Sequence, residues 1–519
     1  MQRSSKQQTI AVYDCLRASV VLSRETALRS AAMKFLLFSF CWFAIAATAN
    51  AESQTHAVAS SDEVEALIES GNLSPGDSIV WSDGVFQDVE LDIEGVDGTK
   101  EAPITLRAAT PGGVVLRGES QFKVGAKWWI VEGFHFDGDE TGVNNYNTFQ
   151  FRSNGGTSAQ HTCLNNCAFT NLKTDGETSK WVLMYGHANS INRCHFSGKS
   201  SKGALVTVEL AYVPEGATAG HIISGNYFAD VAPQPGTDNE TIRIGSSKDQ
   251  NKRAQCVVRG NYFVRCNGEN EIISSKSSYN VFERNTFRQC EGALVLRHGH
   301  HATVAGNFFY GDGAENAGGI RVVDSHHVIV NNYLQGLSGT SWNAAFSILG
   351  GKKTSGGNDN GYQAVDGISV AHNSIINCRQ SVLLNKSKGS RAPSGLFANN
   401  LISSSSGPLV TGELSKEDLR WEGNLMHGTA IGAGVNAIDA DPRLEELSGL
   451  LRPNVNGPAA DAAVKCDIKI ATDIDGQTRP ETGVDVGADE VSGAIGEVAS
   501  VPLDLSAVGV SFLRGDGPK

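Results

Sequence analysis

The chain has 519 residues, with 43 Lys and Arg against 56 Asp and Glu, a net charge of −13, and 58 glycines. Because a protein this acidic repels polyanions on average, nucleic acid is excluded as an expected partner, and an anionic substrate has to be drawn by a local basic strip. Only 19% of the residues are charged and no long amphipathic helical pattern is present, which agrees with a fold rich in β-structure.

Residues 1–51 are predicted to be an N-terminal extension and signal peptide. From Met33 the chain reads MKFLLFSFCWFAIAATANA, with one Lys, an apolar run and small residues at Ala49 and Ala51. We expect cleavage after Ala51 and a secreted or periplasmic protein without membrane contact. An uncleaved anchor is the alternative, although the apolar run is shorter than a membrane span requires.

One helix is expected at residues 62–70, in SSDEVEALIESG. Ser60 or Ser61 would be its N-cap, acids occupy its first turn, and Gly71 would be its C-cap. Since it precedes the first expected strands, its predicted role is to cover the open apolar end of the repeat that follows.

A short motif with Asn before aromatic residues recurs along the middle of the chain, as GNYF, GNYF, RNTF, GNFF and NNYL. Its last residues are separated by 35, 24, 22 and 25 positions; they are Phe228, Phe263, Phe287, Phe309 and Leu334. With weaker copies on both sides, about ten coils are visible. A period in the twenties fits a leucine-rich repeat or a parallel β-helix, because each unit buries its apolar face only against its neighbours.

The segments between these motifs decide between the two repeat folds. The Leu-x-x-Leu-x-Leu signature is missing, and the segments HIISG, CVVRG, ALVLR and HVIVN are short and β-branched, as strands are. We therefore predict an all-β fold, a right-handed single-stranded parallel β-helix over residues 52–490, with stacked Asn side chains at the bends and Phe in the interior. Residues 491–519 lack the repeat, and they form either a loose extension or a segment that packs back along the coil.

Eight cysteines remain after cleavage, and an even number in an exported chain permits disulfides. Several stand at fixed offsets from the repeat Phe, so buried thiols are the preferred interpretation, and no CxxC zinc pattern is present. They are Cys163, Cys167, Cys194, Cys256, Cys266, Cys290, Cys378 and Cys466.

Lys276 and Arg297 lie 21 residues apart in two strand-like runs, close to the repeat interval. If each interval is one coil, both cations lie on neighbouring strands about 4.8 Å apart. Arg321 follows 24 residues later. A single lysine after two serines is ordinarily a surface cation, but three cations at coil intervals indicate work on a polyanion.

Glu269 and Glu271 are two residues apart and therefore share one face of a strand. With Asn239 from the preceding coil they offer oxygen ligands of the kind that Ca²⁺ prefers. Spacing alone favours the alternative, in which two outward glutamates simply pair with Lys and Arg. Beside a bound Ca²⁺ and Arg297, the pKa of Lys276 would be lowered, as a general base requires.

At these residues the chain resembles polysaccharide lyase family 6, which contains alginate lyases and chondroitinase B. The similarity is carried by NEIISSKSS, NTFRQCEGALVLRHG, GNFFYGDG and AGGIRVVDSHH, and it extends from about residue 62 to DVGADE near residue 490. It implies one catalytic lyase domain and cleavage of an anionic uronate polysaccharide by β-elimination.

The resemblance also implies roles for individual residues. Asn239, Glu269 and Glu271 would hold Ca²⁺, Lys276 would remove the C5 proton and Arg297 would protonate the departing O4. Arg321 would bind a substrate carboxylate, and His298 would position Arg297. A cation on the uronate carboxylate is required in any case, because proton removal beside it builds negative charge.

Alginate is the leading substrate. A lyase on dermatan or chondroitin sulfate would need sulfate contacts, for which Lys352 and Lys353 are the available cations. A non-catalytic carbohydrate-binding protein or adhesin would explain the repeat but leave the acid and cation cluster accidental. A polygalacturonase-type hydrolase would need paired Asp residues in the groove, and no convincing pair is present.

Overall fold

The computed structural model describes residues 53–138, 147–173, 178–214, 216–351, 361–432, 434–491 and 502–514. These residues belong to one compact unit, Ser53–Lys519. The predicted signal peptide and residues Lys352 and Lys353 lie outside the described residues. Within those residues, no helix combines the length and the apolar character that a membrane crossing needs.

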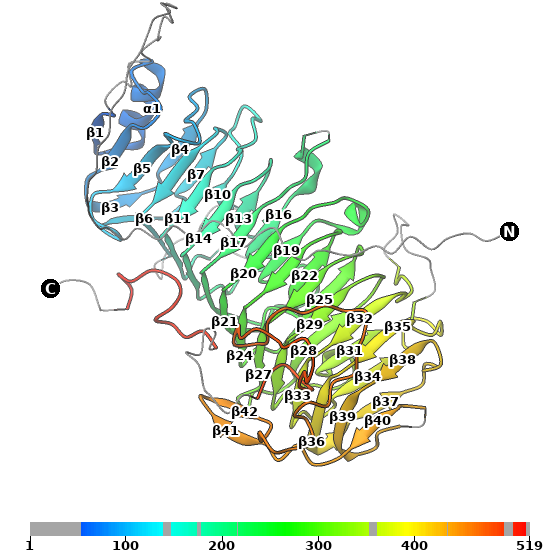
Figure 1. Ribbon diagram of the computed structural model, residues 1–519. Coiled ribbons are helices and arrows are strands. Elements are labelled where there is room, and N and C mark those ends of the chain that lie inside the picture. Colours follow the sequence, from blue (N-terminus) through cyan, green and yellow to red (C-terminus); the bar gives the residue numbers. More distant parts are fainter. Residues whose placement is uncertain are drawn as a thin grey trace, which may run out of the picture. The chain divides into compact units, whose positions relative to one another are not determined.

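Three long parallel sheets, here named A, B and C, wind around one core in the order A, B, C in each coil (Figure 1). Sheet A contains β1 Thr55–Val58, β2 Ser78–Trp81, β5 Ile104–Ala108, β8 Trp129–Glu132, β11 Cys163–Asn165, β14 Ser190–Asn192, β17 Ile222–Ser224, β20 Val257–Arg259, β23 Val281–Glu283, β26 Thr303–Ala305, β29 Val328–Val330, β32 Ile368–Ala371, β35 Gly395–Ala398 and β38 Leu419–Glu422. Sheet B contains β3 Gly84–Gln87, β6 Val114–Arg117, β9 Phe134–Asp137, β12 Ala168–Thr170, β15 His195–Ser197, β18 Tyr227–Val231, β21 Tyr262–Cys266, β24 Thr286–Arg288, β27 Phe308–Tyr310, β30 Tyr333–Gln335, β33 Ser374–Ile376, β36 Leu401–Pro408, β39 Asn424–Thr429 and β40 Ala437–Asp439. Sheet C contains β4 Glu90–Ile93, β7 Gln121–Val124, β10 Asn147–Gln150, β13 Lys180–Met184, β16 Val206–Val208, β19 Ile242–Ile244, β22 Glu271–Lys276, β25 Gly292–His298, β28 Ala317–Val322, β31 Phe346–Leu349, β34 Val382–Asn385 and β37 Val410–Gly412.

The predicted right-handed parallel β-helix is therefore confirmed, and it has more coils than the repeat motif shows. Sheets A and B have 14 strands each and sheet C has 12. The first coils, from β1 to β7, escape the motif because their bends lack the Asn-aromatic sequence. The remaining elements are an antiparallel hairpin, β41 Glu445–Leu447 with β42 Leu450–Arg452, and three short 3₁₀ turns, η1 Leu210–Tyr212, η2 Ser247–Asp249 and η3 Ser341–Asn343.

The Asn residues of the repeat form the predicted ladder. The Oδ1 atom of Asn285 accepts hydrogen bonds from both the backbone N–H and the side-chain amide of Asn261, at 3.1 and 3.0 Å. Asn285 in turn donates to Oδ1 of Asn307 at 3.0 Å. The buried backbone N–H group at each of these bends thereby finds a hydrogen-bond acceptor on the next coil.

Phenylalanine side chains stack in the interior as expected. Ring centroids lie 4.9 Å apart for Phe228 and Phe263, 4.6 Å for Phe263 and Phe287, and 4.5 Å for Phe287 and Phe309, with nearly parallel planes. Each coil thus extends one continuous apolar core.

The predicted capping helix is α1, Ser61–Glu69. Ser60 is its N-cap and accepts a hydrogen bond from the backbone of Glu63 at 3.3 Å, while Ser70 is the C-cap and Gly71 follows at φ +69°. The helix buries Val64 and packs against β4 at the first coils. The sequence misplaced one element, because strand β1 comes before the helix rather than after it.

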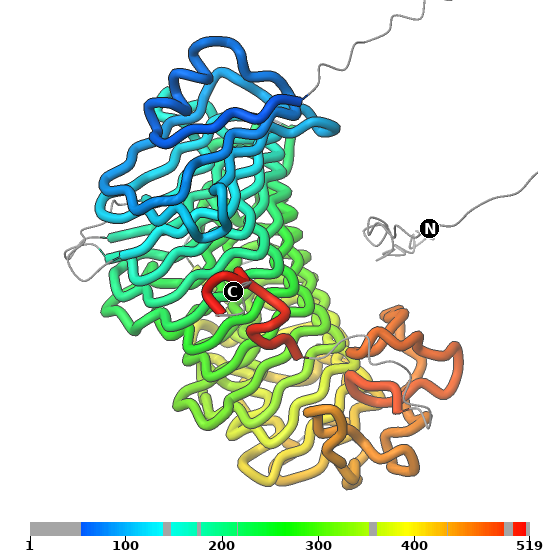
Figure 2. The backbone as a smooth tube through the Cα atoms, turned by 90° about the vertical axis from the view of Figure 1, so that its left-hand side faces the viewer, coloured from blue at the N-terminus to red at the C-terminus, as the bar shows by residue number. Residues whose placement is uncertain are grey.

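The chain after β40 folds back over the outer face of sheet B, as Figure 2 shows. Residues 444–488 bury an apolar cluster there, in which Leu450, Ile474 and Val486 lie with Phe308 and Tyr333 of sheet B. Residues 502–514 of the tail pack back along the coil, which is one of the two arrangements that the sequence allowed. In this segment Val508 and Val510 are buried, and the Gly509 N–H donates to the Gly225 carbonyl at 2.8 Å.

The eight cysteines of the described residues are free thiols, and six of them are buried. Burial raises the pKa of the Cys256 and Cys378 thiols to about 12. The preferred interpretation, buried thiols, holds for these six, while Cys163 and Cys466 are partly exposed.

Candidate active site

The predicted cations lie on the outer face of sheet C, on three successive strands. Lys276 ends β22, Arg297 lies one residue before the end of β25, and Arg321 lies in β28. Ser274 pairs with Val295, which pairs with Arg321, and a register shift after Ser275 places Lys276 opposite His298. Alternation along the strands turns these side chains outward while Leu294 and Leu296 enter the core.

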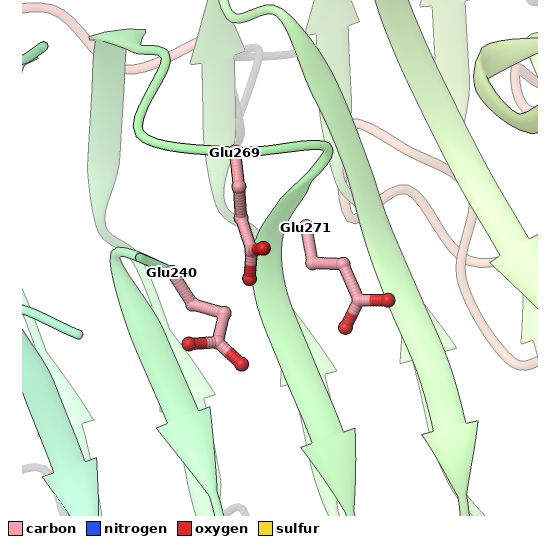
Figure 3. A group of neighbouring side chains, drawn as sticks. All are labelled: Glu240, Glu269 and Glu271. Carbon is pink, nitrogen blue, oxygen red and sulfur yellow. The ribbon is translucent and has the colours of Figure 1, made fainter. Parts of the chain in front are cut away.

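Glu240, Glu269 and Glu271 lie close together, as Figure 3 shows. Glu240 precedes β19, Glu269 lies in the loop before β22, and Glu271 is the first residue of β22. Carboxylate oxygens of the three residues lie within 4.8 Å of one another. The structure thus brings together the two glutamates that the sequence singled out and adds a third.

The electrostatics of this trio suit a divalent cation. Burial, together with the neighbouring charges of Glu240 and Glu271, raises the pKa of Glu269 to about 8. Glu240 is 1% exposed, and its Oε2 atom has no hydrogen-bond partner. Three clustered carboxylates with a buried orphan oxygen form the hard-oxygen set that Ca²⁺ prefers, so the residues present fit that ion.

Lys276 is tied to this cluster. Its Nζ lies 3.0 Å from Oε1 of Glu240, and its side chain is 17% exposed. Glu240 therefore contacts Lys276 with Oε1, and its Oε2 atom takes no part in this ion pair.

Arg297 and His298 are held by the segment after residue 360. The Arg297 guanidinium lies 4.1 Å from the ring centroid of Tyr362 and donates to the Gly361 carbonyl at 3.2 Å. His298 Nδ1 lies 3.1 Å from Oε1 of Gln363 and 3.5 Å from the Arg297 guanidinium. His298 is thus in contact with Arg297, as its expected positioning role requires.

Arg321 is more enclosed than a residue expected to meet substrate. It is 2% exposed, and its guanidinium donates to the Trp342 carbonyl at 3.0 Å and to Oδ1 of Asn343 at 3.0 Å. A further nitrogen lies 3.5 Å from Glu271. In this structure Arg321 fixes Glu271 and the η3 segment, and its predicted contact with a substrate carboxylate stays a prediction.

Asn239 lies directly before Glu240 in the sequence, and its expected role as a calcium ligand stays a prediction. Its Oδ1 accepts a hydrogen bond from the backbone N–H of Gly203 at 3.1 Å, and its buried Nδ2 has no partner. The adjacent Glu240 lies beside Glu269 and Glu271. Sequence reasoning missed Glu240 although it follows Asn239 directly in TDNETIRIG, because residues just before β19 are irregular and alternation does not tell which of two neighbours points outward.

A second acidic group among the described residues lies away from sheet C, at Asp473, Asp475 and Asp489. Arg452 already occupies it, with nitrogens 2.6 and 3.1 Å from the two oxygens of Asp475 and in contact with Asp489. This group therefore has its own cation, which joins β42 to the loop residues Asp475 and Asp489.

Comparison with known proteins agrees with this arrangement. Residues 58–406, more than half of the chain, match the family model described as chondroitinase B. The chain belongs to polysaccharide lyase family 6. No curated protein sequence matches it.

Solved structures of family 6 share the fold. The alginate lyase AlyGC is 27% identical with a TM-score of 0.71, over 88% of this chain. The match covers only 58% of AlyGC, so this chain spans less than two thirds of that enzyme's length. A mannuronic acid specific family 6 lyase from human gut microbiota is 26% identical with a TM-score of 0.64, over 73% of this chain and 87% of that one. The family 6 lyase Pedsa3628 from Pseudopedobacter saltans, 23% identical with a TM-score of 0.60 over 77% of this chain and 99% of its own, shows the fold alone.

Proposed function

We propose that this protein is a calcium-dependent polysaccharide lyase that cleaves alginate by β-elimination. The observation that carries the proposal is the trio of Glu240, Glu269 and Glu271 beside Lys276, with Arg297 on the next strand. Carboxylates that can bind a cation, a general base and a general acid lie on one outer face. Elimination next to a carboxylate requires all three.

Glu240, Glu269 and Glu271 would hold the Ca²⁺, whose charge would neutralise the uronate carboxylate and so acidify the C5 proton. Lys276, in its unprotonated form, takes that proton on Nζ. The C5 electron pair forms the C4–C5 double bond, and the C4–O4 bond breaks with its electrons on O4. Arg297, held in place by Tyr362 and His298, gives a proton to O4, which leaves as a hydroxyl group.

Alginate is preferred over a sulfated polymer on two grounds. The family 6 structures at 26% and 27% identity are described as a mannuronic acid specific lyase and an alginate lyase. In addition, cations on the outer face of sheet C are largely neutralised by carboxylates: Lys180 and Arg243 contact Glu209 at 3.6 and 3.7 Å. A sulfate on each disaccharide would need a row of cations without such partners, and a single cation such as Arg152 does not form a row.

A lyase acting on dermatan or chondroitin sulfate is the second candidate, because the matching family model carries the name of chondroitinase B. The two candidates share the same elimination chemistry and differ only in contacts beyond the reacting uronate.

The test is the ultraviolet absorbance of the unsaturated uronide, which only elimination produces. Alginate, dermatan sulfate and polygalacturonate are each incubated with the protein, with and without EDTA. We expect a rise on alginate that EDTA abolishes and that Lys276→Ala lacks. Lys123→Ala is the matched control, because Lys123 is also an outward sheet C lysine paired with a glutamate, Glu90, at 3.0 Å. No rise on any of the three polymers would show that the protein is not a lyase of these uronates and would favour a carbohydrate-binding role.

We also propose secretion or export to the periplasm, supported by the apolar run and the Ala49 and Ala51 pair. Mass spectrometry of the protein from its native host should find an N-terminus at Glu52. A mature protein that begins upstream of Met33 would contradict this.

A further inference from the structure

An aromatic and cationic cluster lies on the same face of sheet C as Lys276, several coils toward the N-terminal end. The Arg152 guanidinium lies 4.0 Å from the ring centroid of Tyr212 and 5.5 Å from that of Tyr185. The two tyrosine rings meet edge to face with centroids 5.3 Å apart. We name Arg152, Tyr185 and Tyr212 the distal cluster.

Strand register places the distal cluster in line with the candidate active site. Gln150 pairs with Leu183, and the same line continues through Thr207, Arg243, Ser274 and Val295. Two residues further along each strand, the next outward positions are Arg152, Tyr185, Glu209, Gly245, Lys276 and Arg297. Backbone hydrogen bonds from Phe151 to Leu183 and from Glu209 to Met184, both 2.9 Å, continue the pairing beyond the strand ends.

The spacing along this line suits an extended polymer. Tyr185 follows β13 and Lys276 ends β22, with β16 and β19 between them, so three strand steps of about 4.8 Å separate them by about 14 Å. Arg152 lies one step further. A chain that runs along the coil axis over Lys276 and Arg297 therefore passes the distal cluster a few sugar residues away.

The charge of Arg152 distinguishes it from other cations of this face. Lys180, Arg243 and Lys276 each contact a carboxylate. Within the parts of the chain that the structure describes, no carboxylate forms an ion pair with Arg152. Its Nε donates to the Gly156 carbonyl at 3.1 Å, which fixes the guanidinium over Tyr212 without neutralising it.

Tyr212 adds an open aromatic surface. It is 47% exposed, which makes it one of the few large exposed hydrophobic side chains among the described residues. Its η1 turn is held from the side by Lys252, whose Nζ donates to the Leu210 carbonyl at 2.9 Å. An exposed ring with an unneutralised guanidinium beside it matches a sugar that carries a carboxylate, since the ring packs on C–H groups and the fork binds the anion.

We propose that the distal cluster is a binding subsite for a uronate residue of the polymer, about three to four strand steps from Lys276. The sugar packs on Tyr212 and Tyr185, and Arg152 binds its carboxylate. This inference rests on the proposed function, and it assigns the enzyme a preference for long chains over short ones.

The test compares binding of a uronate trisaccharide and an octasaccharide by calorimetry, with Lys276→Ala as the parent chain so that the ligand is not cleaved. A trisaccharide over Lys276 does not reach the distal cluster, whereas an octasaccharide does. We expect Tyr212→Ala and Arg152→Gln each to lower the ratio of octasaccharide to trisaccharide affinity about tenfold. Added salt should weaken octasaccharide binding less in Arg152→Gln than in the parent.

Two further variants keep the test decisive. Arg288→Gln removes a similar cation, 4.2 Å from the Tyr310 ring on sheet B, and should leave the ratio unchanged. Tyr212→Trp keeps an aromatic surface and should retain most of the ratio, even if Tyr212→Ala fails to fold. An unchanged ratio in Arg152→Gln and Tyr212→Ala, or an equal loss for both ligands, overturns the distal subsite. If the parent binds neither ligand and the wild-type chain cleaves no uronate polymer, the proposed function fails instead.

Discussion

Glu240 and Lys276 form an ion pair of 3.0 Å in which the glutamate uses only one of its oxygens. The other oxygen, Oε2, is buried without a hydrogen-bond partner, and the Glu240 carboxylate lies beside those of Glu269 and Glu271. Because a buried carboxylate oxygen without a partner is costly, the Oε2 atom favours a bound cation or water. Glu240 thus links the expected base to the expected metal site.

Replacing Glu240 by Gln should weaken Ca²⁺ binding about tenfold or more, because Ca²⁺ affinity depends on the number of charged ligands. Gln keeps an oxygen that can accept the hydrogen bond from Lys276, so the change isolates the lost charge. Asn239→Ala should have a much smaller effect, since the Asn239 amide contacts Gly203. Calorimetry with Ca²⁺ alone measures both. A large loss in Asn239→Ala with none in Glu240→Gln would make Asn239 the ligand that the family resemblance implies.

Arg321→Met should lower the free energy of unfolding by about 3–5 kcal/mol, because it leaves a largely buried acid without its partner. The variant removes the contact with Glu271 and the hydrogen bonds to Trp342 and Asn343. Urea denaturation measures the loss. The free energy of unfolding of Arg321→Lys should lie between those of the wild type and Arg321→Met, since Lys keeps the charge without the planar fork.

Arg243→Met is the control for this change. Arg243 is also an outward cation of sheet C, but its partner Asp238 is 62% exposed, so its loss should cost less than about 1 kcal/mol. Should Arg321→Met unfold at the wild-type urea concentration and only raise KM, Arg321 is a substrate-binding residue and its structural role is minor.

The fold was predictable because each coil repeats the same physical problem. The backbone N–H at each bend needs an acceptor, and the side chain of Asn285 or Asn307 on the following coil supplies it at a regular interval in the sequence. Where the bend uses another solution the repeat disappears, as in the first coils. The packing of Val508 and Val510 on sheet B joins positions far apart in sequence, and no local pattern encodes such a contact.

The candidate site was predictable where it lies on regular strands. Lys276 belongs to β22 and Arg297 to β25, and the coil interval between them can be counted in the sequence. Glu271 lies five residues before Lys276, and it shares the outer face only because of a register shift between Glu271 and Ile273. Glu240 lies in irregular chain, and the positioning partners Tyr362 and Gln363 come from an insertion between β31 and β32. Their contacts with Arg297 and His298 depend on how that insertion folds, for which the sequence offers no period.

The tail over sheet B should stabilise the fold without affecting activity. A Val508→Ala, Val510→Ala double variant removes buried methyl groups and should lower the free energy of unfolding by about 1–3 kcal/mol. Activity should not change, because the tail lies on sheet B and the site on sheet C. Leu505→Ala, at a position that is 39% exposed, is the matched control in the same segment. Equal stability of the double variant and the control would mean that the tail does not pack on the coil in solution.

Acid should destabilise the protein through histidines that are buried in neutral form. The Nδ1 atom of His327 accepts a hydrogen bond from the Ala302 N–H at 3.1 Å, and its Nε2 donates to the Val323 carbonyl at 2.9 Å. Burial lowers the pKa of His327 to about 4, with Asp324 acting against the shift and His300 and His301 adding to it.

Since the folded-state pKa lies below the ordinary value of about 6.5, the stabilising contribution is fully present above that pH. It is lost as the pH falls from about 6.5 toward 4, by at most about 3 kcal/mol. Protonated Nδ1 would face the Ala302 N–H, which is the physical reason for the loss.

The variant that tests this is His327→Asn, because Asn280 accepts the equivalent hydrogen bond from the Cys256 N–H at 3.0 Å in a neighbouring part of the same ladder. Melting temperatures of the wild type and His327→Asn, measured from pH 8 to pH 4, should diverge below about pH 6.5, with the wild type losing more. Parallel curves over that range would show that His327 does not titrate in the fold, and the remaining acid sensitivity would then belong to other buried histidines such as His221, whose pKa burial lowers to about 3.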